Sequence, residues 1–363
     1  MAKYYIGDIY EKYYLSFLGK ENDKNTMKDS SILLELVHGA LTNMGLDAEV
    51  IYNQYGFTAK KLNDKSKRFK HDANSAFWHA AQEITNDPCI GLHVAEHLPL
   101  YRGQVLEYLF LSSQTFGDGL TRALNYQRLL SDVAQAYLVN DAFDSRLVVD
   151  TRLGSNLNHH FVVCVMYGMS RFFESITEKK FTPLEMDLTI SQPLEMSEYE
   201  RVFGCKVNFS KDHNAIHFDG AVLSQPSRYE PELLSLHEQL ADQHMKKLAQ
   251  QDLVQNVKNI IAELLESQEV TLDVVASKMD MTARNLRTLL ASSQTNFNTL
   301  LSDYRCHLAK RLLVNTAEPM DEIVYLTGFS EPSTFYRAFK RWTGLTPLEY
   351  RNTAKGGAAN SLT

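Results

Sequence analysis

The chain has 363 residues, 44% of them apolar, and a formal net charge of -7. This apolar content is enough for two or three domains with their own cores, so the disordered and fibrous classes are excluded. The longest apolar runs, such as residues 161–169, are about half as long as a bilayer crossing requires. Residues 1–10 lack the basic-then-apolar order of a signal peptide. We therefore expect a cytoplasmic protein without a membrane segment.

The cysteines and the net charge limit the chemistry further. No two of the four cysteines are closely spaced, so neither a disulfide framework nor a zinc knuckle is predicted from Cys89, Cys164, Cys205 and Cys306. A negative net charge argues against a protein whose whole surface wraps nucleic acid, but it leaves room for a local basic face. We expect no cofactor and no metal.

The N-terminal half mixes helical and strand patterns. Residues 1–30 carry aromatic side chains without a clean period, which favours an N-terminal arm. Helical spacing of apolar residues predicts helices over residues 31–44, 74–85, 90–97, 106–111 and 120–137, with Gly117-Asp118-Gly119 as a turn before the last one. Two-residue alternation predicts strands over residues 146–150, 184–190 and 215–218. Residues 31–230 are thus predicted to form an α+β sensory and dimerisation domain.

The C-terminal part carries helical patterns alone. Pro226 and Pro231 mark the exit from the α+β domain, and residues 231–252 are predicted to form a linker helix. No strand pattern remains beyond it, so residues 253–353 are predicted to form an all-α domain. The Gly/Ala/Ser-rich residues 354–363 are predicted to be a disordered tail.

The first of two helix-turn-helix patterns spans residues 272–290. A short apolar helix is followed by a turn, and Thr282 is a good N-cap for the helix that comes next. Leu286 and Leu290 would be buried on that second helix, which leaves three polar side chains outward: Arg284, Arg287 and Thr288. In a helix-turn-helix, the second helix presents such side chains to the major groove of DNA.

The second pattern spans residues 321–342. Its turn contains Gly328, which can take positive φ; Ser330 is expected to cap the following helix, and Pro332 fits the first helical turn. Phe335 and Phe339 would be buried, and the outward side chains are Ser333, Thr334, Arg337, Lys340 and Arg341. A long amphipathic helix over residues 297–313 can space the two recognition helices about one DNA turn apart.

Residues 281–351 resemble the AraC/XylS family of bacterial transcription regulators. The resemblance is densest over residues 328–344, with Thr346-Pro347 and Tyr350-Arg351 behind them. Three further segments are similar to the sensory half of the subgroup with an arabinose-binding-domain-type N-terminal domain: residues 86–92, 112–124 and 231–234.

The chain also departs from the family pattern at three positions. The family usually has Arg, Gly and Leu where this chain has Thr288, Gln294 and Thr327. The first recognition helix therefore offers fewer charges than the second. Nine basic residues against six acidic ones between Thr282 and Thr353 support DNA binding only modestly by themselves.

The resemblance and the motifs together indicate a one-component regulator with no catalytic activity. We expect sequence-specific binding to double-stranded DNA, activation through contact with RNA polymerase, a homodimer, and control by a small-molecule effector in the N-terminal domain. DNA contacts are expected from Arg284, Arg287, Thr288, Ser333, Thr334, Arg337, Lys340 and Arg341. Effector contacts are expected from aromatic or long polar side chains, namely Tyr101, Arg102, Tyr108, Tyr126 and Arg128.

Two alternatives remain open. Residues 93–97 match the inverted zinc-protease pattern H-x-x-E-H, which would make the protein a metallohydrolase using His93, Glu96 and His97. The match is short, Pro99 ends the helix and no third ligand is identifiable, so this class is disfavoured. The other alternative is a regulator whose N-terminal domain senses a protein partner.

Overall fold

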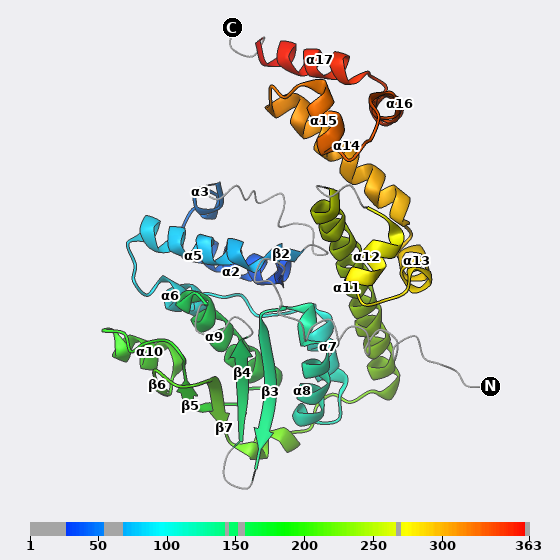
Figure 1. Cartoon of the computed structure of the whole chain (residues 1–363). Helices are drawn as coiled ribbons and strands as arrows, with labels where there is room; N and C mark the ends of the chain where they lie inside the picture. Colours follow the sequence, from blue (N-terminus) through cyan, green and yellow to red (C-terminus); the bar gives the residue numbers. More distant parts are fainter. Residues whose placement is uncertain (1–26, 54–67, 142–144, 152–156, 266–269, 360–363) are drawn as a thin grey trace, which may run out of the picture. The chain divides into compact units, whose positions relative to one another are not determined.

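The structure, a computed structural model, describes residues 27–53, 68–141, 145–151, 157–265 and 270–359. Most of the expected N-terminal arm, residues 1–26, lies outside them. Contacts divide the chain into two compact units, one ending at Met245 and one beginning at Lys246. Helix α11 (Pro231–Leu265) contributes residues to both units (Figure 1). The predicted fold class is confirmed: the described residues form mixed α and β elements in the first unit and helices in the second.

The N-terminal unit is built on a five-stranded mixed sheet. The strand order is β3 (Ala134–Asn140), β4 (Ser145–Thr151), β7 (Asn214–Phe218), β5 (Pro183–Asp187) and β6 (Lys206–Asn208). Neighbours are antiparallel except β5 and β6, which are parallel. Leu147 of β4 is paired with Leu138 on one side and Ile216 on the other, so apolar side chains of three strands share one face.

Helix α9 (His159–Ile176) connects two cores of this unit (Figure 1). On one side it packs against the sheet, where Val163 and Phe173 join Leu147 in a buried cluster. On the other side Phe161 and Cys164 pack with residues of α2 (Ser31–Asn43), α5 (His71–Thr85) and α6 (Ile90–Glu96). The apolar run at residues 161–169, for which no element was predicted, is thus a helix buried on most of its circumference.

Helices α7 (Val105–Ser112) and α8 (Phe116–Asn125) hold the first part of α11. Leu106 and Leu109 of α7 form a small cluster with Leu234 and Ala241 of α11. The remaining elements of the unit are short: β1 (Lys28–Ser30), α3 (Ala48–Asn53), β2 (Arg68–Lys70), η2 (Gln127–Leu129), α10 (Met196–Phe203) and η4 (Gly220–Ser224).

A two-stranded antiparallel ribbon of β1 and β2 is tied to the segment before β3. The carboxylate of Asp29, which is 2% exposed, lies 2.7 Å from His71 Nδ1. The other oxygen of this carboxylate accepts a hydrogen bond from Ser131 Oγ at 2.6 Å. A buried carboxylate with two such partners is stable only in this geometry, so Asp29 fixes the position of β1.

One predicted helix is wrong. The expected helix over residues 120–137 is instead α8, the 3₁₀ turn η2 and strand β3. Gly117 and Gly119, expected in a turn, lie within α8, which Thr115 caps. A Cβ on Gly117 would lie 2.9 Å from the Leu223 carbonyl oxygen, and one on Gly119 would lie 2.8 Å from Phe110 Cα. These glycines therefore serve close helix packing rather than a turn.

Other predictions agree with the structure. The helices expected over residues 31–44, 74–85, 90–97 and 106–111 correspond to α2, α5, α6 and α7. The three expected strands correspond to β4, β5 and β7. Strand β3 and helices α9 and α10 were not predicted.

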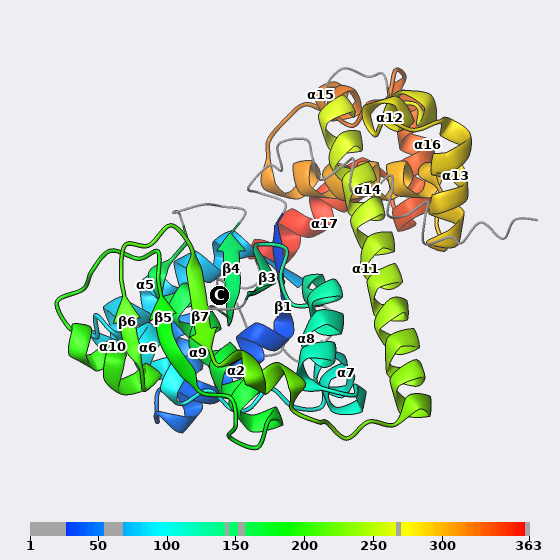
Figure 2. The same ribbon diagram turned by 90° about the horizontal axis from the view of Figure 1, so that it is seen from below.

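The C-terminal unit holds two helix-turn-helix pairs joined by a long helix (Figure 2). Its further helices are α12 (Leu272–Lys278), α13 (Ala283–Ser292), α14 (Phe297–Asn315), α15 (Met320–Leu326), α16 (Pro332–Thr343) and α17 (Pro347–Ala359). The first pair shares a core with α11, formed by Val257, Ile261, Val275, Leu286 and Leu290. The second pair has a core of its own with α14, formed by Ala309, Leu313, Ile323, Phe335 and Phe339.

The expected ends of this domain fall inside helices. Residue 253 lies within α11, whose Leu253 and Val254 already pack against the first core. Gln250 Nε2 donates a hydrogen bond to the Ser292 carbonyl at 3.0 Å. At the other end α17 continues to Ala359, past residue 353, where the tail was expected to begin; residues 360–363 lie outside the described part. In the described ranges no helix is long and apolar enough to cross a membrane.

Residues 246–359 expressed alone should fold as a helical monomer, because their own side chains fill both helix-turn-helix cores. Thermal unfolding followed by circular dichroism should be cooperative, and sedimentation velocity should give the monomer mass. A fragment starting at residue 270 is the control: it lacks Val257 and Ile261 and should lose the cooperative transition. Non-cooperative unfolding of the longer fragment would contradict a division at Lys246.

Candidate DNA interface and sensory cavity

The first recognition helix is α13. Thr282 caps it as predicted, since its Oγ1 accepts a hydrogen bond from the Asn285 backbone N–H at 3.2 Å. Asp280, at φ 54°, forms the turn between α12 and α13. Leu286 and Leu290 are fully buried, and the opposite face carries three exposed side chains, Arg284, Arg287 and Thr288.

The second recognition helix is α16, with Pro332 in its first turn as predicted. The predicted cap is wrong: the N-cap residue is Glu331 rather than Ser330, and no side chain caps this helix. Phe335 and Phe339 are fully buried, and the exposed part of the helix includes all five predicted side chains together with Tyr336: Ser333, Thr334, Arg337, Lys340 and Arg341. Within this exposed part Arg337 Nη2 lies 3.5 Å from Thr334 Oγ1.

The turn before α16 depends on a half-buried arginine of α14. Gly328 takes φ 72°, and its carbonyl accepts a hydrogen bond from Arg305 Nη2 at 2.7 Å. The same guanidinium lies over the Phe329 ring, 4.7 Å from its centroid. Burial lowers the pKa of Arg305, but the group stays charged at neutral pH because a guanidinium is so basic. Arg305, one of the nine basic residues between Thr282 and Thr353, therefore holds the turn before α16 in place.

Aromatic side chains fix α16 against its neighbours. Trp342 Nε1 donates a hydrogen bond to Ser302 Oγ of α14 at 2.8 Å. The Phe339 ring packs edge-on against Tyr350 of α17, with the ring centroids 5.5 Å apart. Trp342 and Tyr350 were recognised only as parts of the family pattern, because a contact between distant helices leaves no periodic signal.

The structure accounts for two of the departures from the family pattern. Thr327 is fully buried at the end of α15, where its hydroxyl donates to the Ile323 carbonyl at 2.6 Å. Thr288 donates to the Arg284 carbonyl at 3.0 Å and lies exposed on α13. A threonine at 327 is thus compatible with the core because its hydroxyl is satisfied locally.

The H-x-x-E-H residues of α6 belong to an ion-pair network. His93 Nδ1 lies 2.6 Å from Asp87 Oδ2, and Arg201 of α10 binds the Glu96 carboxylate with two bonds of 2.9 Å. Burial would lower the pKa of His93, but the hydrogen bonds and charges of Asp87 and Glu198 outweigh it and raise that pKa. His97 Nδ1 lies 2.8 Å from the His93 carbonyl oxygen. These contacts link α6 to α10, and no group of three or more metal-binding side chains occurs among the described residues.

The residues expected to bind an effector do not come together. Tyr101 lines a cavity, but the half-exposed Arg102 pairs outside it with the buried carboxylate of Glu107 at 2.9 Å. Tyr126 donates to Asp242 of α11 at 2.8 Å, and Tyr108 stacks on His237 of α11. Arg128 pairs with Asp132 at 3.0 Å. Apart from Tyr101, these side chains hold helices and loops of the N-terminal unit together.

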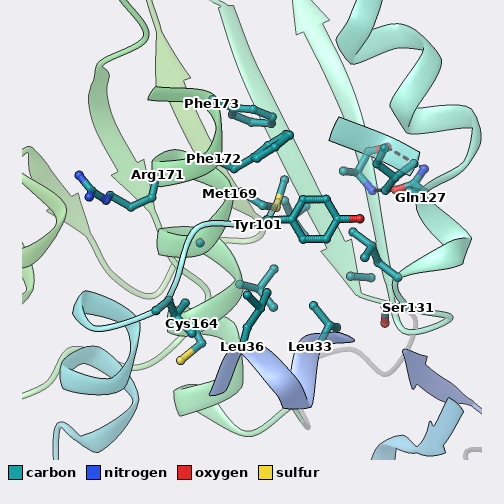
Figure 3. Close-up of a pocket in the computed structure, with 18 of the residues that line it drawn as sticks. Leu33, Leu36, Tyr101, Gln127, Ser131, Cys164, Met169, Arg171, Phe172 and Phe173 are labelled. Atoms are coloured by element: carbon teal, nitrogen blue, oxygen red, sulfur yellow. Dashed lines mark hydrogen bonds between the residues drawn. The ribbon is translucent and has the colours of Figure 1, made fainter. Parts of the chain in front are cut away.

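The cavity lies between α2, α8, α9 and strands β3 and β4, and has a volume of about 210 Å³ (Figure 3). Its wall is almost entirely apolar, with Leu33, Leu36, Met169, Phe172 and Phe173 among the residues drawn. Sequence reasoning found only Tyr101 because the other wall residues read as ordinary core positions. The cavity exists because these five elements meet there without filling the space between them.

Comparison with known protein families gives a match for the N-terminal unit and another for the helix-turn-helix pairs. Residues 45–227 match the family described as "Arabinose-binding domain of AraC transcription regulator, N-term", which is half of the chain. Residues 275–353, which contain both recognition helices, match a helix-turn-helix domain family. The chain belongs to the AraC family of transcription regulators. It is a DNA-binding regulator with an N-terminal sensory domain, and the family is not one of enzymes.

Individual relatives in the AraC family are distant. The ornithine utilization regulator of Pseudomonas aeruginosa is 25% identical over 325 residues, which is 88% of this chain and 94% of the relative. The transcriptional activator CfaD of Escherichia coli is 33% identical over 101 residues, 28% of this chain and 38% of the relative. Among solved structures, the transcriptional regulator CdpR of Pseudomonas aeruginosa is 17% identical with a TM-score of 0.44, covering 88% of this chain and 97% of that one.

Replacing Gly328 should destabilise the DNA-binding half of this AraC-family protein. In G328A the new Cβ would lie 2.6 Å from Leu265 Cδ2 in a backbone conformation with φ 72°. We expect a loss of about 2 to 3 kcal/mol in the free energy of unfolding of residues 246–359. Urea unfolding followed by the fluorescence of Trp342 measures it.

Gly344 provides the matched control. It has φ 79° but nothing within 4 Å of an added Cβ, so G344A carries only the backbone cost of about 1 to 2 kcal/mol. Equal losses in both variants would show that the contact with Leu265 is not important.

Proposed function

We propose that the protein is a sequence-specific transcription activator controlled by a small-molecule effector bound in its N-terminal domain. The observation that carries the proposal is the pair of anchored recognition helices, α13 and α16, each with one buried apolar face and one exposed polar face. The transcriptional activator CfaD, which is 33% identical over part of this chain, supports activation rather than repression. On this proposal the protein acts as a homodimer and contacts RNA polymerase.

The exposed side chains of the two helices would make two kinds of contact with DNA. Base edges would be contacted by Arg284 and Arg287 of α13 and by Ser333 and Arg337 of α16. Phosphates would be bound by Lys340 and Arg341 of α16. Thr288 and Thr334 would lie beside them on the same faces. The 19-residue helix α14 is about 28 Å long, which supports two recognition helices about one DNA turn apart.

The sensory half would act by changing which arrangement of the protein is populated. A ligand shifts such an equilibrium only as far as it binds one state better than the other. Of the residues expected to contact an effector, the proposal keeps Tyr101, since it is the one that lines the cavity. A reporter gene behind a target promoter should respond to the effector in cells with the full chain and not in cells with residues 246–359 alone.

Arg337 should read a base pair. It is exposed on α16 between the buried anchors Phe335 and Phe339. R337A should cost about 1 to 3 kcal/mol of binding free energy on a selected target site and relax the preference at one base pair. Binding titrations against single-base variants of the site measure both effects. A uniform loss over all variants would make Arg337 a phosphate contact instead.

Lys340 should contact phosphate, because it is exposed nearer the C-terminal end of α16. K340A should weaken binding about evenly across sequences and reduce the slope of log affinity against log salt by about one unit. K247A is the control: it removes the same charge from an exposed position on α11 outside both helix-turn-helix pairs. An unchanged salt slope in K340A, or the same change in K247A, would refute this role.

A further inference from the structure

The cavity of the N-terminal unit has an apolar interior large enough for a small organic molecule. Its volume of about 210 Å³ exceeds the roughly 150 Å³ of an apolar protein cavity that is known to stay dry and accept benzene. Aliphatic side chains of α2 and α8 and the rings of Phe110, Phe172 and Phe173 form most of the wall. An interior lined in this way favours an apolar ligand.

Most polar groups in the wall are already paired. Gln127 exchanges two hydrogen bonds with the backbone of Ala136, at 2.5 and 3.2 Å. Ser131 donates to Asp29, and the Cys164 thiol donates to the Gly91 carbonyl at 3.1 Å. Arg171 pairs with Glu174 at 2.8 Å, and its guanidinium points away from Tyr101 (Figure 3). These groups hold the wall in shape and leave little polar capacity for a ligand.

Tyr101 is the exception. Its ring packs edge-on against Phe172, and its hydroxyl lies on the side of Gln127 and Ser131 (Figure 3). Within the described residues this hydroxyl makes no hydrogen bond. Burial and the charge of Glu107 raise the pKa of Tyr101, so the phenol is a neutral donor at physiological pH. It can donate one hydrogen bond to a ligand inside the cavity and accept another.

We propose that this cavity takes a neutral, largely apolar molecule with a single hydroxyl or carbonyl group, which pairs with the Tyr101 hydroxyl. The inference rests on the proposed sensory function and names its ligand class. A sugar would bury several hydroxyls against one free partner, and each unpaired hydroxyl is costly. The described wall contains no carboxylate to pair with the ammonium groups of an amino acid such as ornithine.

A second hollow of the unit provides the competing site. It has a volume of about 550 Å³ and polar lining, including Ser75, His79, His159, Thr189 and Glu195. Such groups would suit a polar ligand, so the two sites make opposite predictions about ligand chemistry. His79 is exposed, and H79A changes the second hollow without touching the cavity.

The cavity is tested by calorimetric titration of the full chain with a series that shares one apolar body: 1-octanol, octanoate and octylamine. L-Arabinose and L-ornithine serve as polar probes. We expect saturable, one-to-one binding of 1-octanol, at least about tenfold weaker binding of the two charged analogues, and no binding of the polar probes. Tightest binding by a charged analogue or a polar probe would overturn the inference.

Matched variants show whether the binding uses this cavity. Y101F removes one hydroxyl and should weaken 1-octanol binding about fivefold, while Y108F, outside the cavity, should not change it. A134L fills the cavity from β3 and should abolish binding, while Q135L, on the opposite face of the same strand, should not. Thermal melts show whether each variant is folded. Unchanged affinity in both Y101F and A134L, or lost affinity in H79A, would overturn the inference.

Failure of the inference and failure of the proposed function give different results. In the first case, 1-octanol binds in the cavity but changes neither the affinity for promoter DNA nor the reporter output. The ligand class is then confirmed, and the proposal that such a ligand controls transcription is wrong. In the second case, a polar probe alters DNA binding through the second hollow. Control of DNA binding by a small molecule is then confirmed, and the inference about the cavity is overturned.

Discussion

The DNA-binding half depends on the contact between Arg305 and the turn at Gly328. A turn between two short helices has few contacts of its own, and its orientation decides where α16 points. Arg305 fixes it with a 2.7 Å hydrogen bond to the Gly328 carbonyl and with its position over the Phe329 ring. Because Arg305 belongs to α14, the same helix that spaces the two recognition helices also orients the second one.

The two recognition helices are therefore held by different means. α13 has a side-chain cap from Thr282 and a turn residue, Asp280, that takes positive φ without being glycine. α16 has no side-chain cap and is anchored instead by Phe335, Phe339 and the bond from Trp342 to Ser302. Sequence reasoning predicted the burial of both phenylalanines, because their spacing along one helix is visible in the sequence. It could not predict the contact of Arg305 or Trp342, since each joins residues more than twenty positions apart.

The same difference between local patterns and long-range contacts decides which elements of the N-terminal unit could be predicted from the sequence. Helices with a clear apolar face, such as α2 and α5, were predicted, and so were β4, β5 and β7 with their alternating pattern. α9 was missed because its first half, residues 161–169, is a continuous apolar run without a helical period; its exposed ion pair, Arg171–Glu174, lies only in the second half. The residues between 120 and 137 were merged into one helix because a short helix, a 3₁₀ turn and a strand of intermediate burial carry no sharp break in hydrophobicity. The cavity could not be predicted from the sequence for a related reason. An unfilled space depends on how the elements pack together, and no residue type indicates it.

An unfilled cavity gives a sensory domain a physical reason to respond to its ligand. Apolar side chains around an unfilled space of about 210 Å³ lack some of the contacts of a close-packed core, and the loss of these contacts costs free energy of folding. A ligand that fills the void recovers much of this energy only in the conformation that holds the cavity open, which is the differential affinity that a population shift requires. The cavity wall includes Ser131, whose hydroxyl binds the buried Asp29 of β1, and α2, which follows β1 directly. Filling the cavity would therefore act first on the ribbon of β1 and β2.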